Sequence, residues 1–312
     1  EGFAVDASVI EANARRFQRV KGSEVEWTEE QLVRRPVREY LSALESDNPP
    51  TNPKQKPKAM SPTDPTAAWT ARGRNKIMFG YSLNYLMDME DAVIVDVEAT
   101  PTRISKEVDA TETMIERTED RFGLKPDRLA GDVAYSTGEM LGWLVERNIT
   151  PYIPVWDQSR VAAEGKFVRA DFDYNKERDL YVCPGGKELR TSGTAHDGTT
   201  IKYIAKRIDC SGCPLKPNCT TGRERRISRD VNQEARDHAQ ALMETDAYYQ
   251  SGVDRKQIER LFGEAKNILS MVRLRLRGLS GAKEEFLLTA TVQNLKRLAN
   301  HSTRPPPEPM AA

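Results

Sequence analysis

One predicted helix carries a glutamate between two cations. The stretch "DRKQIERLFGEAKN", residues 254–267, contains Arg255, Glu259 and Lys266, which fall on a stripe about 40° wide at 100° per residue. The stripe borders an apolar face with the i, i+3, i+4, i+7 spacing of a packed helix, made of Ile258, Leu261, Phe262, Ala265 and Leu269. Glu259 is interpreted either as half of an i,i+4 ion pair or as a metal-binding carboxylate whose flanking cations contact phosphate.

Asp6 is the first carboxylate that is a candidate partner for Glu259. It interrupts "GFAVDASVI", a short apolar run with β-branched members that predicts a strand over residues 2–10. An unpaired charge is costly to bury in such a strand. Asp6 is therefore interpreted either as a metal ligand projecting from the sheet or as a residue on an exposed strand face.

Asp132 is the second candidate partner. It ends the predicted strand "DRLAGD", the position at which open α/β sheets hold their ligands. Its alternative role is to cap the next helix, but a capping box at Ser136 and Glu139 already offers that cap. Asp6, Asp132 and Glu259 together provide three carboxylates from two strands and a helix. Such a set suits two Mg²⁺ or Mn²⁺ ions about 4 Å apart, a site that cleaves phosphodiesters.

Strands and helices must bring these residues together. Three strands, a helix, a strand, a helix and a strand are predicted in that order, which favours a mixed-sheet α/β layer fold. A polar, Pro-rich insertion interrupts the order at about residues 17–75, with one helix that opens at the capping box of Thr28. The predicted elements are strands at 2–10, 76–88, 92–100, 127–132 and 149–155 and helices at 105–121, from 136, from about 232 and at 282–299.

The order "FAVDASVIEANA", "GDVAYST", "RKQIERLFGEAK", "RLRGL" and "VQNLKRLA" resembles bacterial insertion-sequence transposases of the DDE class, which have a ribonuclease-H-like fold. Nearly the whole chain takes part in the resemblance. That group shows an arginine, three residues, the catalytic glutamate, six residues and a lysine, the spacing found here. The resemblance implies that the catalytic, Mg²⁺-binding residues are Asp6, Asp132 and Glu259. The residues expected to contact DNA are Arg255, Lys266, Arg273, Arg275 and Arg277.

The resemblance also implies a function. It is that of a DNA transposase which cleaves DNA and transfers strands with two metal ions, binds transposon ends and target DNA, and commonly acts as a homodimer in the DNA complex. We expect a location in the bacterial cytoplasm, with the nucleoid. The chain opens "EGFAVDASVI" without Met or signal peptide, so an N-terminal region that helps bind the element's ends is expected to be missing. Two other functions stay open, an inactive zinc-stabilised DNA-binding remnant and a plain metal-dependent nuclease.

Some positions depart from the pattern of that group. Gly252 stands three residues before the arginine, where the group often has a tyrosine, and Tyr248 and Tyr249 are displaced upstream. Ala7 and Ser8 replace the usual Gly-Thr or Ser-Thr after the first aspartate.

Asp64, in "SPTDPTA", is a rival for the role of first aspartate. Prolines flank Asp64, whereas Asp6 lies within a predicted strand. Asp6 is therefore preferred.

The cysteines of the chain suit a structural zinc site. Cys210, Cys213 and Cys219 have the spacing C-x₂-C-x₅-C, and Cys183 lies upstream. Without a secretion signal disulfides are disfavoured, and four thiolates fit a tetrahedral Zn²⁺. Reduced structural cysteines and a redox pair are the alternatives. Similar clusters occur in the resembled transposases.

Composition is typical of a soluble globular protein. Of 312 residues, 38% are hydrophobic and 30% charged, and no run of 18 apolar residues predicts a membrane span. The net charge is zero, yet residues 202–229 hold eight Lys or Arg against two acids. This cluster is either a local nucleic-acid surface or a solvated face. The three histidines, His196, His238 and His301, have no ligand spacing.

Four regions are expected from these patterns. They are a ribonuclease-H-like core at residues 1–160, an inserted Cys-rich subdomain at 161–226, a helical remainder of the core at 227–300 and a Pro-rich tail at 301–312.

Overall fold

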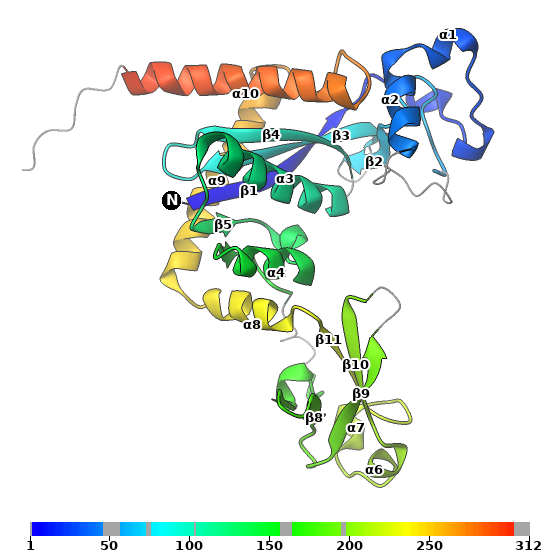
Figure 1. Cartoon of the computed structure of the whole chain (residues 1–312), viewed down its shortest axis with the longest axis vertical. Coiled ribbons are helices and arrows are strands. Elements are labelled where there is room, and N and C mark those ends of the chain that lie inside the picture. The colour runs from blue at the N-terminus through cyan, green and yellow to red at the C-terminus, as the bar shows by residue number, and fades with distance from the viewer. Residues whose placement is uncertain are drawn as a thin grey trace, which may run out of the picture. The chain divides into compact units, whose positions relative to one another are not determined.

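A computed structural model describes residues 2–45, 57–72, 76–102, 104–156, 164–194 and 198–302. Its contacts divide the chain into two compact units (Figure 1). The first, called the sheet unit, comprises Glu1–Ala134 and Asp246–Ala312, and the second, called the cysteine unit, comprises Tyr135–Thr245. The expected boundaries at 160 and 226 stay a prediction. Most of the Pro-rich stretch at 47–58, His196 and the tail after residue 302 lie outside the described residues.

The sheet unit is built on a mixed β-sheet. Strand β1 runs antiparallel to β3 and parallel to β5, while β3 also pairs antiparallel with β2 and β4. This arrangement confirms the mixed-sheet α/β part of the predicted fold class and is compatible with a ribonuclease-H-like fold. The elements are β1 Gly2–Glu11, α1 Glu29–Leu32, α2 Arg35–Leu44, β2 Ala68–Arg72, β3 Lys76–Asp88, β4 Ile94–Pro101, α3 Ile104–Phe122, β5 Arg128–Ala130, α9 Asp246–Asn267 and α10 Leu279–Ser302, with short 3₁₀ turns at Arg16–Gln18, Gly22–Glu24 and, at the unit's edge, Val133–Tyr135.

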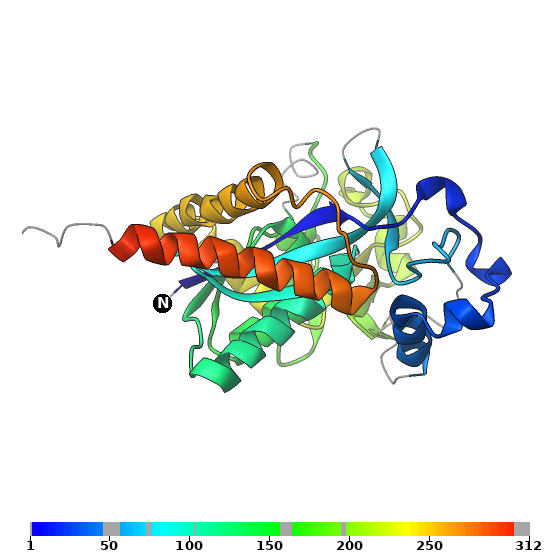
Figure 2. The same ribbon diagram turned by 90° about the horizontal axis from the view of Figure 1, so that it is seen from above.

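Side chains alternate between the two faces of this sheet, and helices cover both faces (Figures 1 and 2). On one face, Tyr85 of β3 stacks on Phe262 of α9 at 5.0 Å and donates a hydrogen bond to Gln293 of α10. On the other face, Ser82 of β3 donates a hydrogen bond to Glu107 of α3. The core lies between sheet and helices, and it holds α9 at a set position over β1.

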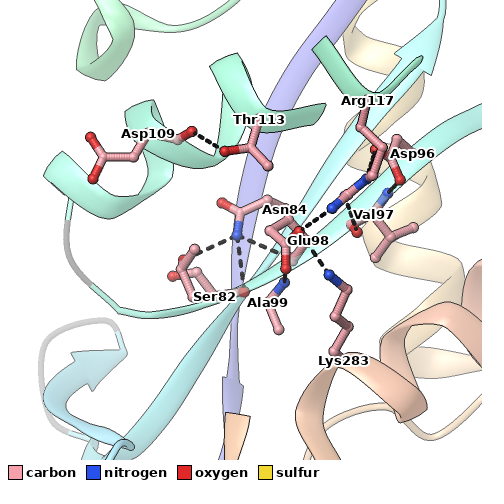
Figure 3. Close-up of polar contacts among 11 residues, drawn as sticks. Ser82, Asn84, Asp96, Val97, Glu98, Ala99, Asp109, Thr113, Arg117 and Lys283 are labelled. Carbon is pink, nitrogen blue, oxygen red and sulfur yellow. Dashed lines mark hydrogen bonds and ion pairs between the residues drawn. The ribbon is translucent and has the colours of Figure 1, made fainter. Parts of the chain in front are cut away.

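A charged cluster ties α3 to β4 on that second face (Figure 3). The Arg117 guanidinium lies 2.7 Å from Asp96 Oδ2 and 2.7 Å from Glu98 Oε2, and also donates to the Val97 carbonyl. Lys283, near the start of α10, adds a contact of 3.0 Å to Glu98. The four charged side chains therefore join two helices to one strand.

The cysteine unit contains an antiparallel sheet of its own, in the order β11-β10-β9-β8-β7. Its core is small and aromatic, centred on Phe172, Tyr181 and Tyr203. The elements are α4 Gly138–Glu146, β6 Thr150–Tyr152, a 3₁₀ turn Arg169–Asp171, β7 Asp173–Asn175, β8 Leu180–Val182, β9 Glu188–Thr194, β10 Thr200–Ala205, α6 Arg207–Ser211, α7 Lys216–Cys219, β11 Arg226–Asp230 and α8 Gln233–Leu242.

Two expectations about helices need correction. The helix start at the Thr28 capping box is confirmed, but that helix is the single turn α1, and a second helix, α2, begins at Arg35 with proline in its first turn. The cap of α4 is Thr137, whose hydroxyl accepts a hydrogen bond from the Met140 N–H at 3.2 Å, and not Ser136. Among the described residues, no helix combines the length and apolar character needed to span a bilayer.

Candidate active site

Asp6 lies in the middle of β1, directly opposite Tyr85 of β3. Its side chain is 18% exposed, accepts the Ala7 N–H at 2.8 Å and lies 3.3 Å from Arg255 Nη1. The pKa of this carboxyl is raised to about 6, mainly by burial and less by the charges of Asp132 and Glu259, while the Ala7 N–H and Arg255 oppose the rise. The three carboxylates thus interact electrostatically.

Asp132 follows β5, the parallel neighbour of β1. Ala4 and Ala130 are paired across the two strands, so Asp6 and Asp132 each stand two residues past this pair. Neighbouring strands lie about 4.8 Å apart, so the two acids come close to each other where β5 ends. Asp132 also accepts the Ala134 N–H at 2.8 Å and so supports the turn that begins at Val133. The capping role considered from the sequence is therefore present, at this turn and not at α4.

Helix α9 supplies the glutamate and the two cations. The predicted apolar face is confirmed for four of its five residues, Ile258, Leu261, Phe262 and Ala265, while Leu269 follows the helix and is half-buried. Arg255 Nη2 lies 3.6 Å from Glu259 Oε1, so the ion pair predicted by spacing exists. The same guanidinium contacts Asp6, however, and therefore bridges two carboxylates. Glu259 stays 59% exposed and accessible to a ligand.

Lys266 lies farther along α9 and contacts the same strand, β1. Its Nζ is 2.5 Å from Ser8 Oγ, and Ser8 shares the sheet face of Asp6 because it is two residues on in β1. Helix α9 thus contacts β1 through two cations, Arg255 at Asp6 and Lys266 at Ser8. The contribution of Ser8 was missed from the sequence, where it appeared only as a departure from the transposase pattern.

Tyr248 is a further residue that sequence reasoning left aside. It precedes Arg255 by seven residues on α9, two helical turns, and Arg255 lowers its pKa against a rise caused by burial. The tyrosine displaced from position 252 is therefore still close to the arginine of the signature. The spacing of seven residues, two turns of a helix, could have indicated from the sequence that Tyr248 and Arg255 share one helix face.

Asp64, the rival aspartate, lies elsewhere in the sheet unit. It is fully buried, accepts the Tyr81 hydroxyl at 2.5 Å and accepts the Gly278 N–H at 3.2 Å. Tyr81 pairs with Ile10, four residues along β1 from Asp6, a separation of about 13 Å. Asp64 therefore belongs to a different, closed environment.

The basic segment "RLRLR" runs beside the end of β1. The Glu11 N–H donates to the Val272 carbonyl, and the Leu274 N–H donates to the Glu11 carbonyl at 2.8 Å. This strand-like pairing buries Leu274 and turns Arg273 and Arg275 to the solvent. The last arginine of the segment, Arg277, is half-buried and donates to the Asn13 carbonyl at 2.9 Å.

The carboxylates suit a hard cation, although they are not arranged as a finished metal site. Within the ranges that the structure describes, no group of three His, Cys, Asp or Glu side chains has the geometry to hold a metal ion. Arg255 lies between Asp6 and Glu259 and supplies the positive charge there. Burial is the main cause of the raised pKa of Asp6, and the negative charges of Asp132 and Glu259 add to it; a divalent cation bound there would favour the ionised carboxylate.

The four cysteines line one small cavity in the cysteine unit, of about 30 Å³. All four are reduced and half-buried, and the Lys187 N–H lies 3.4 Å from Cys183 Sγ. Burial raises the pKa of Cys219, Arg225 lowers it, and the neighbouring thiols raise it. The thiols therefore converge, but they too fall outside the metal-site geometry described above.

Comparison with known proteins gives one match. Residues 182–299 match the family model described as "Transposase DDE domain". The matched region contains Arg255, Glu259, Lys266 and all four cysteines, whereas Asp6 and Asp132 precede it. No curated protein and no solved structure matches the chain. Residues 182–299 are therefore similar to the DDE domain of transposases.

Proposed function

We propose that this protein is a DNA transposase that cleaves phosphodiesters and transfers the strands of an insertion sequence in a two-metal site. The observation that carries the proposal is Arg255 of α9, which bridges Asp6 of β1 and Glu259, together with the pairing of β1 with β5, the strand that ends two residues before Asp132. Transposases of the matched family act on DNA, which is therefore the proposed substrate.

The three carboxylates would hold Mg²⁺ or Mn²⁺. Bound there, the ions supply activation of the attacking oxygen and stabilisation of the leaving oxygen of the phosphodiester. Arg255, released from Asp6, would bind the substrate phosphate through paired N–H donors. Lys266, held by Ser8, would place a second cation on the same phosphate backbone.

The "RLRLR" segment extends this cationic surface. Arg273 and Arg275 are exposed, and each would neutralise one DNA phosphate, with Arg277 beside them. Binding that depends on such contacts weakens linearly with the logarithm of salt concentration. Two copies of the chain are proposed to act together on DNA, which rests on the resemblance alone.

A structural Zn²⁺ is proposed at Cys183, Cys210, Cys213 and Cys219. Support comes from the donor set, four thiols around one cavity, whose thiolates suit tetrahedral zinc. Such a site would stabilise the small sheet and its basic residues without taking part in catalysis. Metal analysis of protein purified without chelator tests this. About one zinc per chain, lost in Cys213→Ser, supports the site, and no zinc overturns it.

A Mn²⁺ titration tests the catalytic centre. The variants are Asp132→Asn and Glu259→Gln, and the control is Asp254→Asn, a half-buried α9 carboxylate bound to Gln250 at 2.8 Å. Loss of Mn²⁺ binding in both variants, with binding intact in the control, supports a shared centre. Equal Mn²⁺ binding in all four proteins would mean that Glu259 only forms an ion pair with Arg255.

Assays on DNA separate the proposed reaction from the two alternatives. Metal-dependent joining of DNA ends supports the transposase, whereas nicking without joining supports a nuclease. Salt-dependent DNA binding with no cleavage supports an inactive DNA-binding remnant.

A further inference from the structure

The segment after β1 is strongly basic and carries an exposed aromatic ring. Residues 12–23 contain Arg15, Arg16, Arg19 and Lys21 and no acid. Lys21 is paired with Glu24 at 2.8 Å. Arg15, Arg16 and Arg19 are all exposed and keep the segment cationic.

Phe17 lies among these arginines with 79% of its surface exposed. The guanidinium carbon of Arg16 lies 4.4 Å from the ring centroid, so a cation contacts the ring. Exposed aromatic surface is unfavourable in water, and a large exposed ring within a basic segment is the pattern of a nucleic-acid stacking platform. Phe122, at the end of α3, is also 62% exposed, but it follows "TEDR" and so lies beside acids.

A row of cations leads from the candidate active site to this segment. Each of these residues contacts β1, or the residues just after it, at a position farther along the strand than the one before. Arg255 contacts Asp6, Lys266 contacts Ser8, Arg273 pairs with Glu11, and the carbonyl of Arg275 accepts from Asn13. A phosphate backbone laid along β1 over these cations would reach the segment at Phe17.

The register of the sheet gives the distance. Arg19 lies 5.2 Å over the ring of Trp69, and Trp69 pairs with Phe79 of β3, while Asp6 pairs with Tyr85. The six residues from Tyr85 to Phe79 span about 20 Å of strand. With about 3.4 Å per base step, Arg19 of the segment is about six steps from Asp6, measured along the strand direction. Figures 1 and 2 show the chain after β1 leaving the sheet at the end where β2 lies.

We propose that Phe17 stacks on a DNA base about six steps from the cleaved phosphodiester, while Arg15, Arg16 and Arg19 bind the flanking phosphates. The inference rests on the proposed function, because it takes DNA as the substrate. The ligand is the flat face of a nucleobase, and its source is either a locally unpaired base or a base step of intact duplex that the ring opens.

Two duplex probes test this with the full chain. Both contain 2-aminopurine, a fluorescent base that is quenched on stacking. In one probe it is unpaired in a bulge, and in the other it is paired. The variants are Phe17→Ala, Phe17→Leu and Phe17→Trp, and Phe122→Ala is the matched control. Because Phe17 is largely exposed, its replacement leaves folding intact, which circular dichroism checks.

Phe17→Ala should weaken binding about 5- to 100-fold and abolish 2-aminopurine quenching. Phe17→Leu should be weakened like Phe17→Ala, whereas Phe17→Trp and Phe122→Ala should bind as the wild type does. A loss confined to the bulged probe identifies an unpaired base, and a loss on both probes identifies an opened duplex step. Either supports base stacking. Unchanged affinity and quenching in Phe17→Ala on both probes overturns it.

Cleavage by the wild type with Mn²⁺ keeps the two proposals apart. If the wild type cleaves and Phe17→Ala behaves identically to it, the stacking proposal fails and the transposase stands. If the wild type binds through Phe17 without cleaving, the stacking proposal stands and the transposase fails. Where cleavage occurs, the strongest quenching should map about six steps from the cut, and quenching next to the cut contradicts the path along β1.

Discussion

Arg255 of α9 contacts Asp6 of β1 with 3.3 Å between Nη1 and Oδ2, although the two residues are 249 positions apart. The same side chain lies 3.6 Å from Glu259 through Nη2. Arg255 is therefore a counter-ion shared by two of the three candidate metal ligands. In the proposed enzyme the arrangement holds the carboxylates together before metal and DNA arrive.

Replacing Arg255 by Met should separate metal binding from catalysis. Without the guanidinium, Asp6 and Glu259 repel each other more strongly, so Mn²⁺ affinity should stay the same or rise several-fold. DNA cleavage should fall about 10²- to 10³-fold because a donor to the reacting phosphate is lost. Isothermal titration and single-turnover cleavage measure the two effects. Arg260→Met, an exposed arginine on the same helix, is the control. Loss of Mn²⁺ binding in Arg255→Met would contradict the counter-ion role.

Ser8 should act by positioning Lys266. Ser8→Ala removes the hydroxyl that accepts a hydrogen bond from Lys266 Nζ at 2.5 Å, while the lysine and its charge are kept. We expect cleavage to fall about tenfold, and Ser8→Thr to restore it, because threonine keeps the hydroxyl and suits a strand. The salt dependence of DNA binding should change little, since the cation remains. Wild-type cleavage in Ser8→Ala combined with a large loss in Lys266→Ala would exclude the positioning role.

Local patterns predicted the regular elements of the sheet unit well. The apolar runs at 2–10 and 76–88 became β1 and β3 because β-branched and aromatic residues fill two buried faces. Strand β2 was missed. It is five residues long, lies in the polar region assigned as an insertion, and is recognisable only by its pairing with β3. Short strands of this kind depend on a partner and carry little signal of their own.

The candidate site was predictable in residue type but not in contacts. Helical spacing placed Arg255 and Glu259 on one stripe, yet nothing local indicated that Asp6 would join them. Ser8 and Lys266 are 258 positions apart, and their contact follows from the docking of α9 on β1. The resemblance to DDE transposases predicted the three acids from the sequence. Which side chains contact them is determined by tertiary packing, which the sequence patterns did not reveal.

Arg117 should stabilise the sheet unit through its two carboxylate contacts. Its side chain is only 18% exposed, and those of Asp96 and Glu98 are 12% and 15% exposed. Arg117→Met would leave the Asp96 carboxylate without this cation and Glu98 with Lys283 alone. The free energy of unfolding should fall by about 2–3 kcal/mol, below the value for fully buried pairs because water reaches the cluster. Urea denaturation measures it.

A matched change shows whether burial causes that loss. Lys106→Met removes an ion pair on the same helix, 2.9 Å long, in which the Asp109 side chain is 57% exposed and reached by solvent. It should change the free energy of unfolding by less than about 0.5 kcal/mol. Equal effects of the two substitutions would mean that the Arg117 cluster adds no more than a surface pair.

Asp64 makes the stability of the sheet unit depend on pH. Burial raises its pKa from 3.8 to about 6, against the effects of the Tyr81 hydroxyl, the Gly278 N–H and Arg277, and Glu39 adds a smaller rise. Among the described residues, its Oδ2 has no hydrogen-bond partner, which favours the protonated form. The folded state thus binds this proton more tightly than the unfolded state.

The free energy of unfolding should therefore fall as pH rises from about 4 to 6 and then level off. Over this range the unfolded state is already ionised at Asp64, and the folded state loses its proton only near pH 6. The change is about 3 kcal/mol for a difference of roughly two pKa units. In Asp64→Asn, the carbonyl keeps the acceptor for Tyr81 and Gly278 while the titration is gone. Urea denaturation at pH 3.5, 5 and 7 measures the free energy of unfolding of both proteins. Between pH 3.5 and 7 the wild type should lose about 3 kcal/mol relative to the variant. A constant difference would show that folding does not raise the pKa of Asp64.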